Sequence, residues 1–149
     1  MTDAAASVPD NAHRRPPGAS DELVQAVGKV SEAWEWVERV RGRLYDLHQM
    51  VGHTDFLFGD AAAALRAAGA AEHADLLERE VVGRNLLDGR WSFQIVEEFD
   101  DGYYRPVQAI DRRVRDDLMG GRRHVYEAEL KEQRRTEGHP DQTSRPTEA

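Results

Sequence analysis

Residues 20–51, SDELVQAVGKVSEAWEWVERVRGRLYDLHQMV, decide the fold of this chain. Two rows of apolar residues repeat in this stretch with a period of seven. The first row is Leu23, Val30, Val37, Leu44 and Val51, and the second is Ala26, Ala33, Val40 and Leu47. A repeat sustained over four heptads is typical of a coiled coil or a helical bundle. Ser20 is followed by Asp21 and Glu22, which predicts an N-cap and an acidic first turn at the start of this helix.

Polar residues lie at the edge of this apolar stripe. Arg41 and His48 occupy the heptad position at which Val27 and Trp34 stand earlier in the repeat. A polar residue at such a position either specifies the packing register or belongs to a functional site. The sequence leaves both readings open.

Glycines are predicted to separate the helices. The first helix is expected to end at Gly52, and further helices are expected over residues 55–68, 70–82, 103–118 and 122–135. Pro106 either begins the helix over residues 103–118 or kinks a longer one. The short connections between these segments predict antiparallel neighbours.

The segment that begins at Trp91 fits two kinds of structure. Trp91, Phe93 and Ile95 alternate as they would in a strand, whereas Trp91, Ile95 and Phe99 are spaced by four as on one face of a helix. No second strand-like run is present with which a strand could pair, and a lone strand leaves its backbone groups without partners. Helix is therefore the prediction for residues 91–99.

Together these patterns predict one all-α domain, an antiparallel helical bundle of about four to five helices with a long first helix. The helical domain is expected to cover residues 20–135. Residues 1–19 and 136–149 are rich in proline and small polar residues and show no apolar period, so both termini are predicted to be disordered.

Composition excludes several classes of protein. The chain has 149 residues, 40% of them apolar, and no run approaches the ~20 apolar residues of a membrane span. It contains no cysteine, which excludes disulfide scaffolds, cysteine-ligated zinc and thiol nucleophiles. A net charge of -8 marks an acidic protein and argues against nucleic acid as a partner. Because the first twenty residues have no apolar signal region, a cytoplasmic location is expected.

Histidines and carboxylates at helical spacing form a candidate metal site. His124 and Glu127 are three positions apart, and Glu97 and Asp101 are four apart, so each pair shares a helix face. With His48 they give five candidate ligands of the non-heme iron type, which helical bundles build from facing helices. The Glu-x-x-His order of that class appears only reversed, in HVYE, and solvated or ion-paired side chains are the alternative interpretation.

A second candidate site consists of arginines beside glycines. Arg84 and Arg90 lie next to an Asp-Gly turn, and Arg122 and Arg123 follow two glycines, a pattern that could hold a phosphate or carboxylate. Trp91 and Tyr103 belong to an aromatic-rich stretch that forms either core or a binding groove.

No convincing catalytic group or cofactor is identified by the sequence, so enzymatic activity stays undecided. The interpretation that the sequence favours is a dimerising protein-interaction module, because the long apolar repeat and a last helix poor in apolar residues both call for a partner. That partner is expected to be a second copy of the chain, with another protein as a further option. The metal-binding bundle and the arginine-based anion sensor are the alternatives.

Overall fold

A computed structural model of the chain describes residues 9–143, and within these residues every regular element is a helix. The elements are α1 (Asp21–Ala67), α2 (Ala71–Glu80), α3 (Ser92–Phe99), the π-helical segment η2 (Asp100–Tyr104), α4 (Arg105–Met119) and α5 (Val125–Arg134). The predicted all-α class with a long first helix is confirmed. Of the segment predicted helical over residues 91–99, residues 92–99 form a helix, whereas Trp91 is extended and serves as its N-cap. Over residues 9–143 no helix has the length and apolarity that crossing a lipid bilayer demands.

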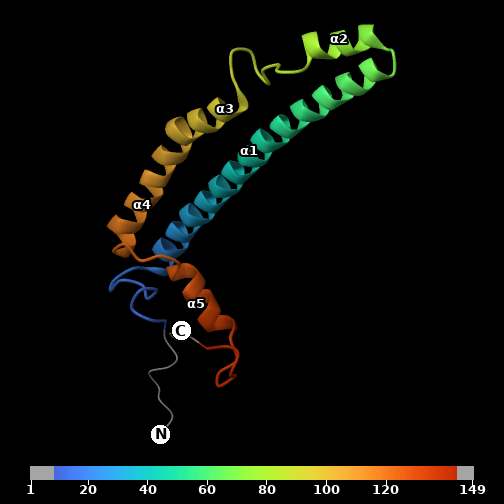
Figure 1. Cartoon of the computed structure of the whole chain (residues 1–149). Helices are drawn as coiled ribbons and strands as arrows, with labels where there is room; N and C mark the ends of the chain where they lie inside the picture. Colours follow the sequence, from blue (N-terminus) through green and yellow to red (C-terminus); the bar gives the residue numbers. More distant parts are fainter. Residues whose placement is uncertain (1–8, 144–149) are drawn as a thin grey trace. The chain divides into compact units, whose positions relative to one another are not determined.

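The chain divides into two compact units. The hairpin unit consists of residues 37–106, and the terminal unit consists of residues 9–36 and 107–143 of the described chain. Helices α1 and α4 each contribute residues to both units. Figure 1 shows the elements coloured along the chain.

The predicted disordered termini fall partly outside the described residues, at 1–8 and 144–149. Within the described part, residues 9–19 form turns, and Arg15 binds Glu129 of α5. Beyond α5 the chain also turns, where the Thr136 N–H donates to Gln142 Oε1 at 2.6 Å. The boundaries of the helical domain stay a prediction.

Helix α1 is longer than the sequence led us to expect. It continues for 47 residues through Gly52, so the predicted break there, and the separate helix over residues 55–68, are wrong. Glycine lowers helix stability by only about 1 kcal/mol, and the packing of the residues on either side outweighs that cost. The helix begins as predicted, with Ser20 Oγ accepting from the Leu23 N–H, and it ends before Gly69, whose φ is +82°.

In the hairpin unit the second half of α1 packs against the segments that follow it in the opposite direction (Figure 1). Near the turn Arg66 binds both Asp75 and Glu78 of α2 at 2.8 Å. Farther from the turn Arg41 binds Asp100. Residues with higher numbers in α1 thus bind residues with lower numbers in the returning chain. Two segments that pair in this order run antiparallel.

The structure corrects which heptad rows of α1 are covered. The first row is covered as predicted, with Val37 buried and Leu44 half-buried. The second covered row is the one that contains Arg41 and His48. The predicted second row, which contains Val40 and Leu47, is exposed. The reason is geometric. The returning segments lie on one side of α1 and can cover only two adjacent rows. These are the first row and the row of Arg41 and His48, so the predicted second row stays exposed.

A π-helical turn joins α3 to α4 and accommodates Pro106. Proline has no N–H and its ring crowds the carbonyl four residues earlier, so it disrupts a regular α-helix. Here the wider turn Asp100–Tyr104 comes directly before Arg105 and Pro106, and the helix continues to Met119. Of the two readings of Pro106, the structure supports a longer, locally distorted helix.

The terminal unit has a small apolar core made of the first turns of α1, the end of α4 and the start of α5. Its buried members are Val24, Val27, Met119 and Val125. Asp111, only 3% exposed, lies in α4 and accepts two hydrogen bonds from the Arg115 guanidinium. Gly28 lets α5 approach α1, because a Cβ at this position would lie 3.0 Å from the Cβ of Tyr126.

Candidate functional site

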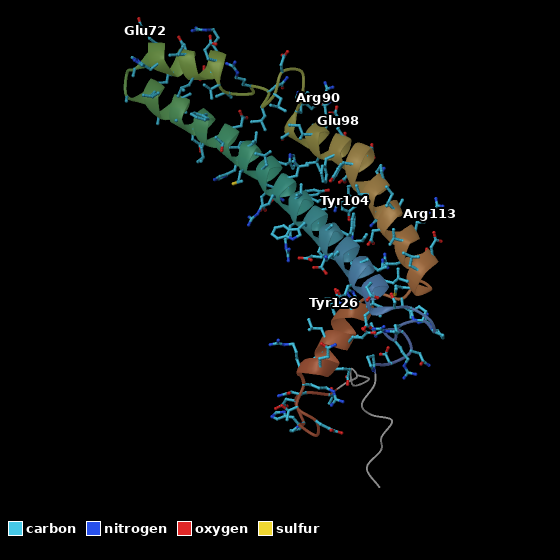
Figure 2. The ribbon with its side chains drawn as sticks, turned by 180° about the vertical axis from the view of Figure 1, so that it is seen from behind. Glu72, Arg90, Glu98, Tyr104, Arg113 and Tyr126 are labelled. Carbon is cyan, nitrogen blue, oxygen red and sulfur yellow. The ribbon has the colours of Figure 1, made fainter. Side chains whose placement is uncertain are left out.

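The inner face of the hairpin unit carries an ion pair that lies beside the ring of Tyr104. The Arg41 guanidinium donates to both carboxylate oxygens of Asp100, at 2.8 and 2.9 Å. It also lies over the Tyr104 ring, 4.6 Å from its centre, and the Tyr104 hydroxyl donates to Glu38 at 2.8 Å. The hydrogen bonds from Arg41 hold the pKa of Asp100 below its usual value, whereas burial, followed by the bond to Glu38, raises the pKa of Tyr104. Figure 2 labels Tyr104 beside α1.

Two further polar contacts continue along the same face. His48 Nδ1 lies 2.8 Å from Ser92 Oγ at the start of α3, and Asp55 Oδ1 accepts from the Gly83 N–H at 2.6 Å. Arg41 and His48 are therefore satisfied by partners in the returning segments. Of the two readings left open for them, these contacts support the one in which polar residues set the packing register.

The outer face of α1 carries an exposed stripe of four apolar and two polar residues. Its members recur every three or four residues: Val40, Arg43, Leu47, Met50, Thr54 and Leu57, called here the outer stripe. The apolar side chains are exposed by 49% for Val40, 37% for Leu47, 60% for Met50 and 52% for Leu57. At about 100° of rotation per residue, the outer stripe lies roughly 110° around the helix from the covered rows. Helix α1 therefore carries exposed apolar side chains on a face separate from its covered rows.

Charged and polar residues border the outer stripe on one side. They are spaced by seven and comprise Arg39, Asp46, His53 and Asp60, called here the flanking row. All four are exposed. Along the row the two carboxylates alternate with one arginine and one histidine. In coiled coils such border positions select the partner and its orientation.

The terminal unit brings three potential metal ligands together. Glu35 of α1, His124 and Glu127 each offer one ligand atom, and these atoms lie within 4.8 Å of one another. All three residues are exposed. His124 precedes α5 with φ +56°, in the left-handed region, where a non-glycine residue is uncommon. Backbone strain of this kind clusters at functional positions.

The five predicted metal ligands divide between the two units. His124 and Glu127 belong to the terminal unit, where they meet Glu35, a residue that the sequence analysis missed. His48, Glu97 and Asp101 belong to the hairpin unit. There His48 contacts Ser92, Asp101 pairs with Arg105, and Glu97 is exposed. No local pattern marks Glu35, because its place beside His124 follows only from the packing of α5 on α1.

The predicted anion-binding arginines also divide between the units, and three of them bind acceptors of the chain itself. Arg90 pairs with Glu98 at 2.7 Å, as labelled in Figure 2, and Arg84 donates to the Glu80 carbonyl. Arg122 donates to the carbonyls of Asn11 and Met119, and Arg123 is exposed.

The two aromatic residues predicted for binding are exposed, and each contacts the ring of a nearby aromatic residue. Trp91 packs edge-on against Phe93, with ring centres 5.1 Å apart. Tyr103 lies 5.6 Å from the ring centre of Phe99. Both lie on the returning side of the hairpin unit.

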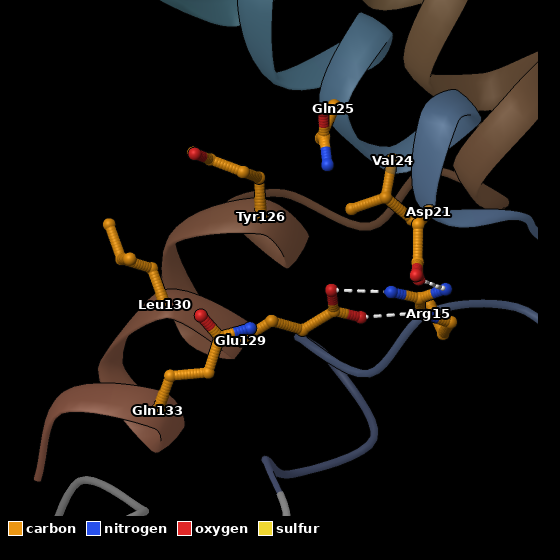
Figure 3. Close-up of a pocket in the computed structure, with 8 residues that line it drawn as sticks. All are labelled: Arg15, Asp21, Val24, Gln25, Tyr126, Glu129, Leu130 and Gln133. Atoms are coloured by element: carbon orange, nitrogen blue, oxygen red, sulfur yellow. Dashed lines mark hydrogen bonds and ion pairs between the residues drawn. The ribbon is translucent and has the colours of Figure 1, made fainter.

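A pocket of about 180 Å³ opens between α5 and the start of α1 in the terminal unit (Figure 3). Its charged groups already satisfy one another, because the Arg15 guanidinium is held by Asp21 at 2.7 Å and by both oxygens of Glu129 at 2.6 and 2.7 Å. An ionic ligand would have to displace these bonds. The outer stripe and the Glu35–His124–Glu127 group are therefore the stronger candidate sites.

Comparison of the chain with protein-family models, with curated proteins and with solved structures gives no match.

Proposed function

We propose that this protein is a homodimerising interaction module whose contact surface is the outer stripe of α1. The single observation that carries this proposal is the row of large apolar side chains that the chain itself leaves exposed on a well-formed helix. Covering such side chains is favourable by roughly 25 cal/mol per Å² of apolar area removed from water. A second copy presents the same surface, so an isologous contact buries two stripes at once.

Adjacent residues of α1 give a matched test. Met50 lies on the outer stripe, whereas Gln49 is exposed on a face away from both the stripe and the covered rows. Because each copy contributes its own residue 50, Met50→Asp would bury two charges in the proposed contact. It should raise the dimer dissociation constant about 100-fold or more. Gln49→Asp carries the same helix-propensity cost and should leave the constant within about threefold.

Sedimentation equilibrium of the wild type and both variants measures the effect. A wild-type protein that stays monomeric at high micromolar concentration overturns the proposal. So does a dimer that Met50→Asp and Gln49→Asp weaken equally.

A second candidate function is binding of a divalent metal by Glu35, His124 and Glu127. The closeness of the three ligand atoms supports it, and zinc accepts this mixture of imidazole and carboxylate. Three protein ligands would leave a fourth position open to water.

Cobalt(II) tests this candidate through its visible absorption, which reports coordination directly. A 1:1 absorbance change should appear with the wild type and disappear in His124→Asn, because asparagine tolerates the left-handed conformation yet ligates poorly. His48→Asn, in the hairpin unit, is the matched control and should bind as the wild type does. A spectrum that remains that of free cobalt(II) contradicts the metal site.

A further inference from the structure

The order of residues along the outer stripe is the same from either end. Val40, Arg43, Leu47, Met50, Thr54 and Leu57 read apolar, polar, apolar, apolar, polar, apolar. A symmetric order of this kind matches a second copy related by a two-fold axis, since that operation pairs the first member with the last. We infer that two copies of α1 pair antiparallel along the outer stripe, with the two-fold axis passing between His48 and Gln49; this inference rests on the proposed function.

The core pairing that follows is complementary in polarity. Leu47 faces Met50 of the second copy, and Val40 faces its Leu57. The two polar members then meet, with Arg43 beside Thr54. The Thr54 hydroxyl already donates to the Met50 carbonyl at 2.7 Å, so its lone pairs are free to accept from a guanidinium. No apolar member of the stripe is left against a charge.

The flanking row is complementary in the same register. In an antiparallel pair, residues of this border row contact the same row of the partner. Arg39 then lies opposite Asp60 of the second copy, and Asp46 lies opposite its His53. The apolar order and the charge order are separate features of the sequence, and both select one register.

Neighbouring registers lack this match. Sliding the copies by one heptad in one direction sets Leu47 against Arg43 and places the two Asp46 carboxylates opposite each other. Sliding them the other way sets Met50 against Thr54 and places Asp46 opposite Asp60. A parallel, in-register pair stacks Arg43 on Arg43. Like charges in contact disfavour each of these alternatives.

The absence of cysteine from the chain makes disulfide cross-linking a direct test. Val40→Cys and Leu57→Cys change exposed positions, so the fold should be kept, and far-UV circular dichroism checks it. The two variants, mixed and refolded together, should oxidise mainly to the mixed disulfide dimer, whose mass is distinct. Val40→Cys alone should stay unlinked, because its two thiols would lie about 25 Å apart along the helix axes.

Other outcomes separate the two proposals. Preferential linking of Val40→Cys with Met50→Cys, or of Val40→Cys with itself, overturns the register while the dimer stands. A wild type that sediments as a monomer overturns the dimer itself. Charge reversal gives an independent check: Arg39→Glu and Asp60→Arg should each weaken the dimer several-fold, and the double variant should regain most of the wild-type affinity. Failure of the double variant to recover contradicts the predicted charge pairing.

Discussion

Gly52 lies in the interior of α1, and apart from its chain neighbours and the backbone of the helix itself, no atom lies within 4 Å of the place where a Cβ would stand. Gly52→Ala should therefore raise the free energy of unfolding by about 0.5–1 kcal/mol, the difference in helix propensity between the two residues. Urea denaturation measures it. Gly28→Ala is the contrasting variant: the new methyl group would crowd Tyr126, so the gain should shrink or reverse. Equal stabilisation by both substitutions would contradict the close approach of α5.

Asp100 gives the hairpin unit a pH dependence of known sign. Its pKa is lowered by the hydrogen bonds from Arg41, so the carboxylate stabilises the folded state above its unfolded pKa of about 4. That stability is lost as the pH falls through the lower, folded pKa. Asp100→Asn should accordingly flatten the dependence of unfolding free energy on pH below about 5. An Asp100→Asn variant that keeps the wild-type slope would contradict this prediction.

The role of a single residue was predictable from the sequence where that residue acts through its neighbours in the chain. Ser20 was correctly identified as the N-cap from the acids that follow it. Gly52 was misjudged because packing along α1 outweighs the local cost of one glycine. Glu35 carried no signal at all, since its partner histidine lies on a different helix.

At the scale of elements, Asp55 joins α1 to the end of the turn after α2. Its carboxylate accepts from the Gly83 N–H at 2.6 Å, and Gly83 adopts φ +74° there. Asp55→Ala should remove the protection of the Gly83 amide against hydrogen exchange, with little change at amides in the middle of α1. Exchange followed by NMR reads both sites in one sample. Asp60→Ala, an exposed position farther along α1, should leave the Gly83 amide protected.

The helices were largely predictable because apolar spacing is a local property, and the segment from Ser92 to Phe99 confirms it. Which rows of α1 are covered was not predictable from spacing alone. Val40 and Leu47 were placed in the buried seam, yet the returning segments cover the row of Arg41 and His48 instead. The seven-residue spacing of Met50 and Leu57 was the available signal that α1 has a second apolar face.

At the scale of the whole molecule, dimerisation through the outer stripe would couple stability to concentration. Each tenfold dilution should then lower the free energy of unfolding by about 1.4 kcal/mol of dimer, so the melting temperature should fall on dilution. Differential scanning calorimetry over two decades of concentration measures this shift. Met50→Asp should melt at a temperature independent of concentration, and a wild type that behaves the same way would contradict the coupling.

The antiparallel contacts of the hairpin unit also limit where the gene that encodes it can gain or lose codons. Arg41, His48, Asp55 and Arg66 each meet a partner at a matching distance along the returning chain. Inserting one codon between Arg41 and Asp55 would rotate all that follows by about 100° and carry the later partners off the shared face. Length changes should therefore be tolerated at residues 68–70 and 84–90, outside the helices. Within α1 they should come in sevens and be balanced by a matching change in the returning segments, because seven extra residues also move the later partners about 10 Å along the helix.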